Sequence, residues 1–168
     1  MKRRAITLLF ILALSASASA TDHFQRDFIA TSALRGETDL GALEYSVETI
    51  PYENLPESAK NIARWIGTDG GVPEFVVRSI RIRIGKRKVS LPEAAFRDLA
   101  NPILPSGLEA SVKDGDLIIK LSGGHEDNLY RAEFTVRGGR ALERKLYLLG
   151  VPDAPPEVLQ LPPSSKGP

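Results

Sequence analysis

The feature that most constrains this chain is a series of short alternating segments joined by tight turns after residue 108. Each segment alternates apolar with polar side chains, which is the period of a half-buried strand. The segments are Glu109–Lys113, Asp116–Ser122, Asn128–Arg137 and Ala141–Leu149. Asp114-Gly115 and Gly138-Gly139 between them are favoured hairpin turns. Such short connections allow only antiparallel pairing, so the sequence predicts an antiparallel meander with one buried face.

Two further regions have strand patterns. Ala42–Ile50 alternates, with Leu43, Tyr45 and Val47 on one side, and ends before Pro51. Phe75–Ile84 is rich in β-branched residues and alternates isoleucine with arginine. A turn at Gly85-Lys86 and a return through Val89 and Leu91 predict a hairpin there.

Helical spacing occurs between these strands. The apolar positions of Leu55–Ile66 recur at the period of an amphipathic helix, with Asn54 as the cap and Pro56 early in the first turn. A short second helix is expected from Pro92 to Asn101, with Ala95, Phe96 and Leu99 on its inner face. We therefore expect an α+β fold, an antiparallel sheet of about five to seven strands packed against one or two helices.

The first residues predict export. Lys2–Arg4 form a positive stretch, Ile6–Leu14 an apolar one, and Ala18-Ser19-Ala20 a small-residue cleavage pattern. We expect a signal peptide over residues 1–20, cleaved after Ala20. The apolar run is much shorter than the ~20 residues of a membrane-spanning helix, so no stable membrane span is expected after cleavage.

The rest of the chain is expected to form one domain and a tail. Residues 21–150 are long enough for a single α+β domain with its own core. Residues 151–168 are rich in proline, which predicts a disordered tail. The alternative is a docking strip with Val158, Leu159 and Leu161 as its apolar anchors.

The amino-acid composition limits both the cellular compartment expected for the protein and the chemical groups that it can use. The chain has no cysteine, which excludes disulfides, a thiol nucleophile and thiolate metal ligands. Exported eukaryotic domains of this size often carry disulfides, so their absence favours a periplasmic or secreted protein of the bacterial envelope. Three of the 22 basic side chains lie at positions 2–4 and all 21 acidic ones lie after residue 20, so the chain from Thr21 has a formal net charge of −2. This balance does not predict a nucleic-acid partner.

Sequence motifs for catalysis are missing. The chain has no G-x-S-x-G, no H-E-x-x-H, no phosphate-binding P-loop and no G-x-G-x-x-G. The sequence therefore favours a non-enzymatic binding or accessory protein, with no cofactor, no metal and no catalytic residue assigned.

A basic strand is the first candidate site. Arg78, Arg81, Arg83 and Lys86–Lys88 place many cations on and beyond one strand, with Arg81 and Arg83 on the same face. One interpretation is a solvated face or a charged edge that prevents sheet-to-sheet pairing, with Glu133 and Glu143 as ion-pair partners.

The alternative for the basic strand is an anion-binding patch. Its residues would be Arg81, Arg83, Lys86, Arg87 and Lys88. Such a patch would contact an anionic envelope polymer or an acidic protein, because charges act locally within a Debye length of ~10 Å.

The loop SGGHEDN is the second candidate. His125, Glu126 and Asp127 follow two glycines between predicted strands, which is the composition of a turn. A metal or ligand contact is the alternative, and a small metal-dependent enzyme that uses Tyr130 beside these residues is a third possibility. Zinc would need ligands from elsewhere, such as His23 and Asp27, and no spacing supports that combination.

Overall fold

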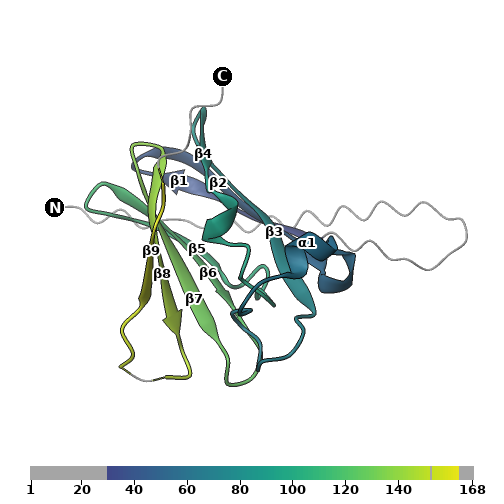
Figure 1. Cartoon of the computed structure of the whole chain (residues 1–168). Coiled ribbons are helices and arrows are strands. Elements are labelled where there is room, and N and C mark those ends of the chain that lie inside the picture. Colours follow the sequence, from purple (N-terminus) through teal and green to yellow (C-terminus); the bar gives the residue numbers. More distant parts are fainter. Residues whose placement is uncertain (1–29, 152, 163–168) are drawn as a thin grey trace, which may run out of the picture.

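Two antiparallel sheets form the body of the protein. The computed structural model describes residues 30–151 and 153–162 (Figure 1). One sheet has the order β1-β2-β3-β4 and the other the order β5-β6-β7-β8-β9. Neighbours in each sheet are also neighbours in sequence, so both sheets are meanders. The antiparallel architecture predicted from the alternating segments is confirmed.

Nine strands and little helix occur among the described residues. The four-stranded sheet contains β1 (Ala30–Thr38), β2 (Gly41–Pro51), β3 (Phe75–Ile84) and β4 (Arg87–Ser90). The five-stranded sheet contains β5 (Leu108–Lys113), β6 (Asp116–Gly123), β7 (Tyr130–Arg137), β8 (Arg140–Leu148) and β9 (Glu157–Gln160). The helical elements are α1 (Glu57–Lys60) and two short 3₁₀ turns, η1 (Tyr52–Asn54) and η2 (Glu93–Ala95).

The tight turns lie where the sequence places them. Asp114 and Gly115 both have positive φ, at 54° and 83°, and so do Gly138 and Gly139, at 58° and 81°. Two central residues of positive φ define the type I′ turn, whose twist matches that of the flanking strands. Gly85, with φ of 56°, likewise begins the turn of the β3–β4 hairpin. The hairpin predictions in both sheets are confirmed.

The second sheet, and not a helix, covers the buried face of the first. The strands cross obliquely, and one hydrophobic cluster lies between them (Figure 1). Tyr45 and Val47 from β2 are fully buried there, as are Leu117 from β6 and Phe134 from β7. The prediction that helices would cover the dry face is therefore wrong.

The predicted helix over Leu55–Ile66 is also wrong. Only the single turn of α1 is helical, and none of its residues is buried. Ile66 instead donates its N–H to the Asp98 carbonyl at 2.8 Å and accepts from the Ala100 N–H at 2.9 Å. These bonds require an extended backbone at Ile66, and a short isolated helix is only marginally stable in water.

The segment after Pro92 enters the core without forming the expected helix. Its helical part is the three residues of η2, but Ala95, Phe96 and Leu99 are buried as the pattern predicts. Asn101 then joins three segments. Its side chain accepts from the backbone N–H groups of Glu74 and Phe75, at 3.0 and 3.1 Å, and donates to the Gly67 carbonyl at 3.2 Å.

Part of the expected disordered tail is an ordered strand. β9 pairs with β8 in the register Glu143↔Gln160 to Leu146↔Glu157. Leu161 follows it, is 5 % exposed and belongs to the core. The prediction of a disordered tail is therefore wrong for residues 157–161. The proposed docking anchors therefore differ in exposure: Leu161 is buried in the core, whereas Val158 is exposed.

The connections between the strands lie at two opposite ends of the molecule. The turns of the β1–β2, β3–β4, β5–β6 and β7–β8 hairpins lie at the upper left of Figure 1. The longer connections, residues 52–74 and the β6–β7 loop, lie at the opposite end. The predicted signal peptide, residues 1–20, and His23 and Asp27 lie outside the described residues.

Candidate functional site

The end of the molecule with the four hairpin turns holds a groove of about 470 Å³. Each hairpin contributes to its lining: Leu40 from the first, Ile84, Lys86 and Arg87 from the second, Gly115 from the third, and Val136, Gly138 and Gly139 from the fourth. The groove therefore combines two cationic side chains with an apolar wall and a turn backbone without side chains.

The arginines within β3 are neutralised by the neighbouring strand. Arg78 and Arg81 pair with Glu48 of β2 at 3.3 and 3.0 Å. Arg83 pairs with Glu44, which Arg35 of β1 also contacts at 2.9 Å. Arg81 and Arg83, two of the predicted anion-binding residues, thus already have carboxylate partners.

A β-bulge brings Arg78 onto this face. The β2–β3 register shifts between Glu48 and Thr49, so that Glu48 faces Ser79 and Thr49 faces Val77. Arg78 is the extra residue, and a bulge of this kind redirects side chains. As a result Arg78 and Arg81, an odd number of positions apart, reach the same carboxylate.

The predicted acidic partners were wrong. Glu133 pairs with Arg131 at 3.0 Å and Glu143 with Lys145 at 3.0 Å, both within the other sheet. The hydrogen bond from Arg35 and the charge of Arg83 lower the pKa of Glu44 from its ordinary value, although partial burial opposes them. Glu44 therefore stays ionised and holds its arginines at neutral pH.

The tip of the β3–β4 hairpin differs from the strand below it. Lys86, Arg87 and Lys88 are exposed, and within the described residues none of them forms an ion pair. Arg87 packs directly on the β7–β8 turn, since a Cβ added to Gly139 would lie 2.2 Å from its Cδ. The structure therefore presents three of the five predicted anion-binding residues as available cations and anchors one of them against the neighbouring hairpin.

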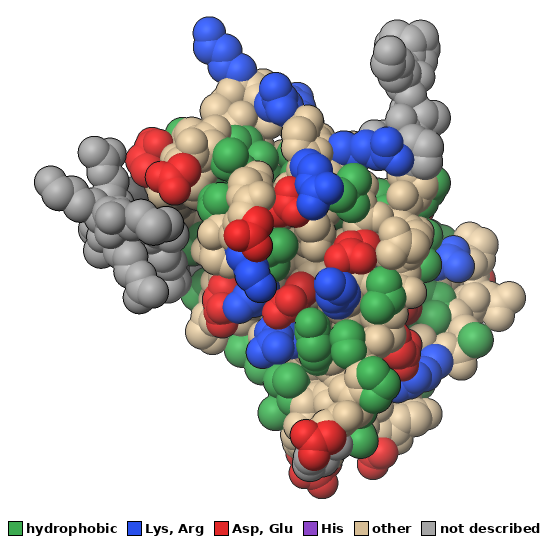
Figure 2. Space-filling model, turned by 90° about the vertical axis from the view of Figure 1, so that its left-hand side faces the viewer, with side chains coloured by type: hydrophobic (Ala, Val, Ile, Leu, Met, Phe, Trp, Pro, Cys, Tyr) green, Lys and Arg blue, Asp and Glu red, His purple; other side chains and the backbone are tan. Residues whose placement is uncertain are grey.

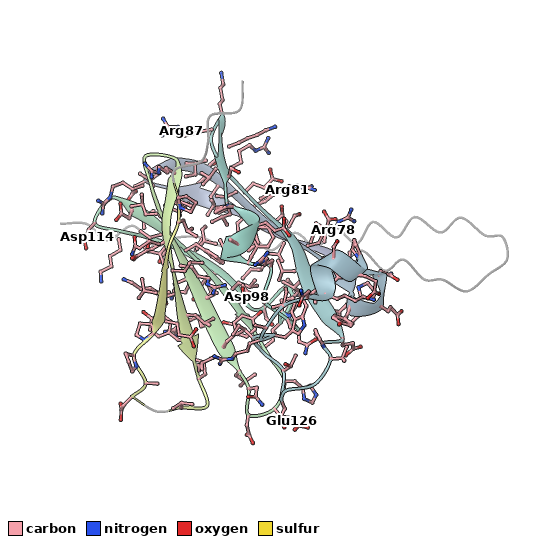
Figure 3. All side chains as sticks on the ribbon, viewed as in Figure 1. Arg78, Arg81, Arg87, Asp98, Asp114 and Glu126 are labelled. Carbon is pink, nitrogen blue, oxygen red and sulfur yellow. The ribbon has the colours of Figure 1, made fainter. Side chains whose placement is uncertain are left out.

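Other charges at this end leave it positive. Lys113 and Arg140 flank the β5–β6 and β7–β8 turns, whereas Glu37, Asp39 and Asp114 lie at or beside the β1–β2 and β5–β6 turns. Figure 3 labels Arg87 at the hairpin tip and Asp114 on a separate turn. Figure 2 shows Lys and Arg side chains gathered toward the upper end, with acidic groups to one side.

The exposed face of the five-stranded sheet is balanced in charge. Cross-strand and neighbouring pairs join Lys120 to Glu109 at 3.3 Å, Arg137 to Asp116 at 2.7 Å and Lys145 to Glu143 at 3.0 Å. The middle of Figure 2 shows Lys and Arg interspersed with Asp and Glu. Such pairs stabilise adjacent strands and leave little net field.

The second predicted site lies at the opposite end. His125 and Glu126 side chains are 74 and 79 % exposed, and His125 Nδ1 is 3.7 Å from Glu126 Oε1. Glu126 has a positive φ of 50°, and the Asn128 N–H donates to the His125 carbonyl at 3.0 Å, as in a turn. Figure 3 places Glu126 far from Arg87, so the structure does not bring the two candidates together.

Tyr130 does not join the loop residues at the surface. Its ring is fully buried beneath Gly123, where an added Cβ would lie 2.4 Å from the hydroxyl. Burial raises the pKa of Tyr130 far above its ordinary value. The buried neutral phenol is therefore separated from the exposed His125 and Glu126.

A buried ion pair was missed by sequence reasoning. Arg144 of β8 is 6 % exposed and contacts both Asp98 carboxylate oxygens, at 2.5 and 3.0 Å, and the Ala95 carbonyl at 3.1 Å. The signal for it is in the last strand, where Arg144 alternates in phase with Leu142, Leu146 and Leu148. A cation on the apolar side of a strand needs a buried partner.

Across residues 30–151 and 153–162, no group of three or more histidine, aspartate or glutamate side chains is arranged to hold a metal ion. The same residues contain no helix with the length and hydrophobicity needed to cross a membrane. The chain matches no family model, no curated protein and no solved structure.

Proposed function

We propose that this chain is a non-enzymatic binding protein of the bacterial envelope that contacts an anionic envelope polymer through the tip of the β3–β4 hairpin. Residues 1–20 would direct export and be removed after Ala20. Lys86, Arg87 and Lys88 would meet phosphate or carboxylate groups of the polymer, and Arg81 and Arg83 would support the hairpin below them.

This proposal rests on a difference in ion pairing between the arginines within β3 and the cations at the hairpin tip. The arginines within β3 share Glu44 and Glu48, while the hairpin-tip cations have no carboxylate partner within the described residues. A cation held by a carboxylate must exchange that partner to bind an anion, whereas a solvated cation need not. The tip therefore offers charge for binding, and the strand offers charge that stabilises the sheet.

The position of these cations at a projecting hairpin tip supports contact with a polymer. The groove beside Lys86 and Arg87 is formed by turns from four hairpins. Its cations lie along an edge that projects from the sheet, as Figure 3 shows for Arg87. Binding of this kind depends on counterion release and weakens as salt rises.

The test compares two triple variants of the full chain without residues 1–20. One carries Lys86→Gln, Arg87→Gln and Lys88→Gln. The other carries Lys60→Gln, Arg64→Gln and Arg131→Gln, which remove the same formal charge at the opposite end of the molecule. Retention on immobilised lipopolysaccharide and on immobilised polyphosphate is measured across a salt gradient.

The hairpin variant is expected to bind at least about threefold more weakly at low salt and to lose most of its salt dependence, since each exposed ion pair contributes roughly 0.2–1 kcal/mol. The distal variant should behave as the unchanged protein does. Equal losses in both variants would show a response to net charge alone, and unchanged retention of the hairpin variant would reject the site.

A further inference from the structure

A second and larger groove, of about 660 Å³, lies at the other end of the four-stranded sheet. Its floor consists of buried apolar side chains from β2, β3 and the segment after η2: Ile50, Val76, Val77 and Phe96. Its wall is the connection between β2 and β3, through Leu55, Pro56, Ala59, Ile62 and Trp65. The volume lies in the range of ligand sites, roughly 300–1,000 Å³.

The wall carries an apolar pattern that the fold does not bury. Leu55, Ala59 and Ile62 are spaced as for the inner face of a helix, yet each is only half-buried. Side chains that a core would normally cover therefore remain in contact with solvent along the groove. The groove thus presents apolar side chains beside polar ones.

The wall is anchored at its two ends. The Tyr52 N–H donates to the Glu74 carbonyl at 3.0 Å, and Ile66 bonds the segment around Asp98. Between them, the Ala59 and Ile62 N–H groups donate only to the nearby Pro56 and Lys60 carbonyls. The middle of the wall is thus joined to the sheets by fewer backbone hydrogen bonds than its ends, and Arg64 links it to Glu157 of β9 at 3.2 Å.

The rim favours a peptide over a lipid chain. Ser58 and Asn61 border the groove with a hydroxyl and an amide group, which can both donate and accept hydrogen bonds as a peptide backbone does. A hydrocarbon chain would desolvate these groups without replacing their hydrogen bonds. The polar rim is therefore complementary to an extended peptide that places apolar side chains on the floor.

The rim carries charges of both signs. Arg78, Arg97 and Glu93 line the groove, and Arg78 is the one paired with Glu48. Arg97 is exposed and forms no ion pair with another described residue. Arg97 is thus the cation best placed to meet a carboxylate of an occupant.

We infer that this groove binds an extended apolar segment of a partner protein, with a carboxylate of that segment at Arg97. The inference is independent of the anion-binding hairpin, because the two sites share no lining residue and lie at opposite ends of the sheet. The protein would then join a protein partner to an anionic polymer.

Binding in the groove can be followed by the fluorescence of Trp65. It is the single tryptophan of the chain, it lines the groove, and it is half-buried. Its ring meets Tyr52 edge-to-face, with centroids 5.8 Å apart. An occupant that covers the wall should remove water from the indole and shift its emission to shorter wavelength.

The experiment titrates the full chain without residues 1–20 with hexapeptides of leucine and valine, in two forms: a free C-terminal carboxylate and a C-terminal amide. Trp65 emission is recorded for the unchanged protein, for Arg97→Gln and for the control Arg64→Gln. Arg64 is an exposed arginine of the same segment that does not line this groove. Dodecanoate and dodecylamine are titrated in parallel.

The expected result is a saturable blue shift with the peptides, about threefold or more tighter for the carboxylate form, as for an exposed ion pair. Arg97→Gln should abolish the difference between the two forms, and Arg64→Gln should keep it. The hairpin triple variant should bind the peptides unchanged, which separates this site from the proposed polymer site.

Two results would overturn the inference. One is a saturable response to dodecanoate with none to any peptide, which would assign the groove to an amphiphile. The other is no saturable response to any probe at millimolar concentration. A blocking variant, Ala59→Glu, provides the second check, because an added carboxylate on the wall should weaken the peptide with a free carboxylate more than the amide.

Discussion

Arg144 is a buried cation that depends on a single carboxylate partner. It extends from β8 into the core, where Asp98 accepts two hydrogen bonds from its guanidinium. The pair joins the five-stranded sheet to the segment that enters the space between the sheets. Desolvating both charges offsets much of their attraction, so the pair contributes specificity more than net stability.

Asp98→Ala should therefore destabilise the protein strongly. The change leaves Arg144 buried without a carboxylate, which costs about 3–5 kcal/mol in the free energy of unfolding. Denaturant unfolding followed by Trp65 fluorescence measures this loss. Asp98→Leu combined with Arg144→Met should restore most of the stability, and a cost below about 1 kcal/mol for Asp98→Ala would contradict the assigned role of the pair.

Two buried tyrosines make stability depend on alkaline pH. Burial and the nearby Tyr130 raise the pKa of Tyr45 well above its ordinary value, and burial likewise raises the pKa of Tyr130. In the unfolded chain both phenols would lose their protons at pH ~10. The native state then holds more protons than the unfolded state, so stability is complete below about pH 10 and falls as pH rises above it.

Unfolding curves at pH 8 to 11.5 test this dependence. Tyr45→Phe removes one phenol, together with its 3.3 Å hydrogen bond to the Lys120 carbonyl, and should reduce the slope of stability against pH above 10. Tyr52→Phe is the control, since Tyr52 lies half-buried outside the core. An equal slope in the unchanged protein and in Tyr45→Phe would contradict the prediction.

At the scale of single elements, β9 shows that a proline-rich segment can complete a sheet. Its side chains are mostly exposed, so the strand is held by pairing with β8 and by Leu161 beyond its end. Leu161 donates its N–H to the Leu142 carbonyl at 2.8 Å. The strand thus covers one edge of the five-stranded sheet.

Leu161→Ala should cost about 2–4 kcal/mol in the free energy of unfolding, as expected for a leucine truncated in a packed core. Val158→Ala, in the same strand but exposed, should cost less than about 0.5 kcal/mol. Equal and small costs for both changes would mean that this segment is not part of the folded domain.

The ion pairs between β2 and β3 can be removed so that the arginines become available to bind an anion. Glu44→Gln with Glu48→Gln would remove the carboxylates that hold Arg35, Arg78, Arg81 and Arg83. The arginines of these pairs are exposed although the two carboxylates are mostly covered, so the loss of stability should stay near ~1 kcal/mol per pair. Retention on immobilised polyphosphate should rise and depend more steeply on salt.

The control for this change is Glu109→Gln with Glu133→Gln, which alters net charge equally on the other sheet. Stronger retention of the control by the same amount would attribute the effect to net charge. Unchanged retention of Glu44→Gln with Glu48→Gln would show that the β3 arginines do not reach the polymer.

At the scale of the whole molecule, the two proposed sites lie at opposite ends of one sheet. The hairpin end would bind an anionic polymer and the groove end a peptide, with the core between them. This arrangement allows both partners to bind at once. The proposed function would also require export, because an envelope polymer lies outside the cytoplasm.

Expression in a bacterial host should yield a protein whose first residue is Thr21, recovered from the periplasm or the medium. Intact mass and N-terminal sequencing provide the measurement. Ala18→Leu with Ala20→Leu should block cleavage, because the signal peptidase accepts small residues at these positions. A chain that still begins at Met1 and stays in the cytoplasm would contradict the proposed location.

The candidate site could be predicted only in part. Alternation placed Arg81 and Arg83 on one face, and the turn at Gly85 placed Lys86–Lys88 at a hairpin tip. The ion-pair partners could not be read from the sequence, because they depend on which strand lies beside β3. The bulge at Glu48 and Thr49 adds a further change that no alternating pattern reveals.

Local sequence patterns specify strands β2 to β8 and the turns of the β3–β4, β5–β6 and β7–β8 hairpins, but neither β1 nor β9. Alternation and the conformational freedom of glycine act over a few residues, and so Asp114-Gly115 and Gly138-Gly139 specify turns without help from distant parts of the chain. The tertiary structure alone decided that one sheet covers the other, that Leu55–Ile66 lines a groove, and that Arg144 meets Asp98. Each of these depends on contacts between residues far apart in sequence, which local propensity does not determine.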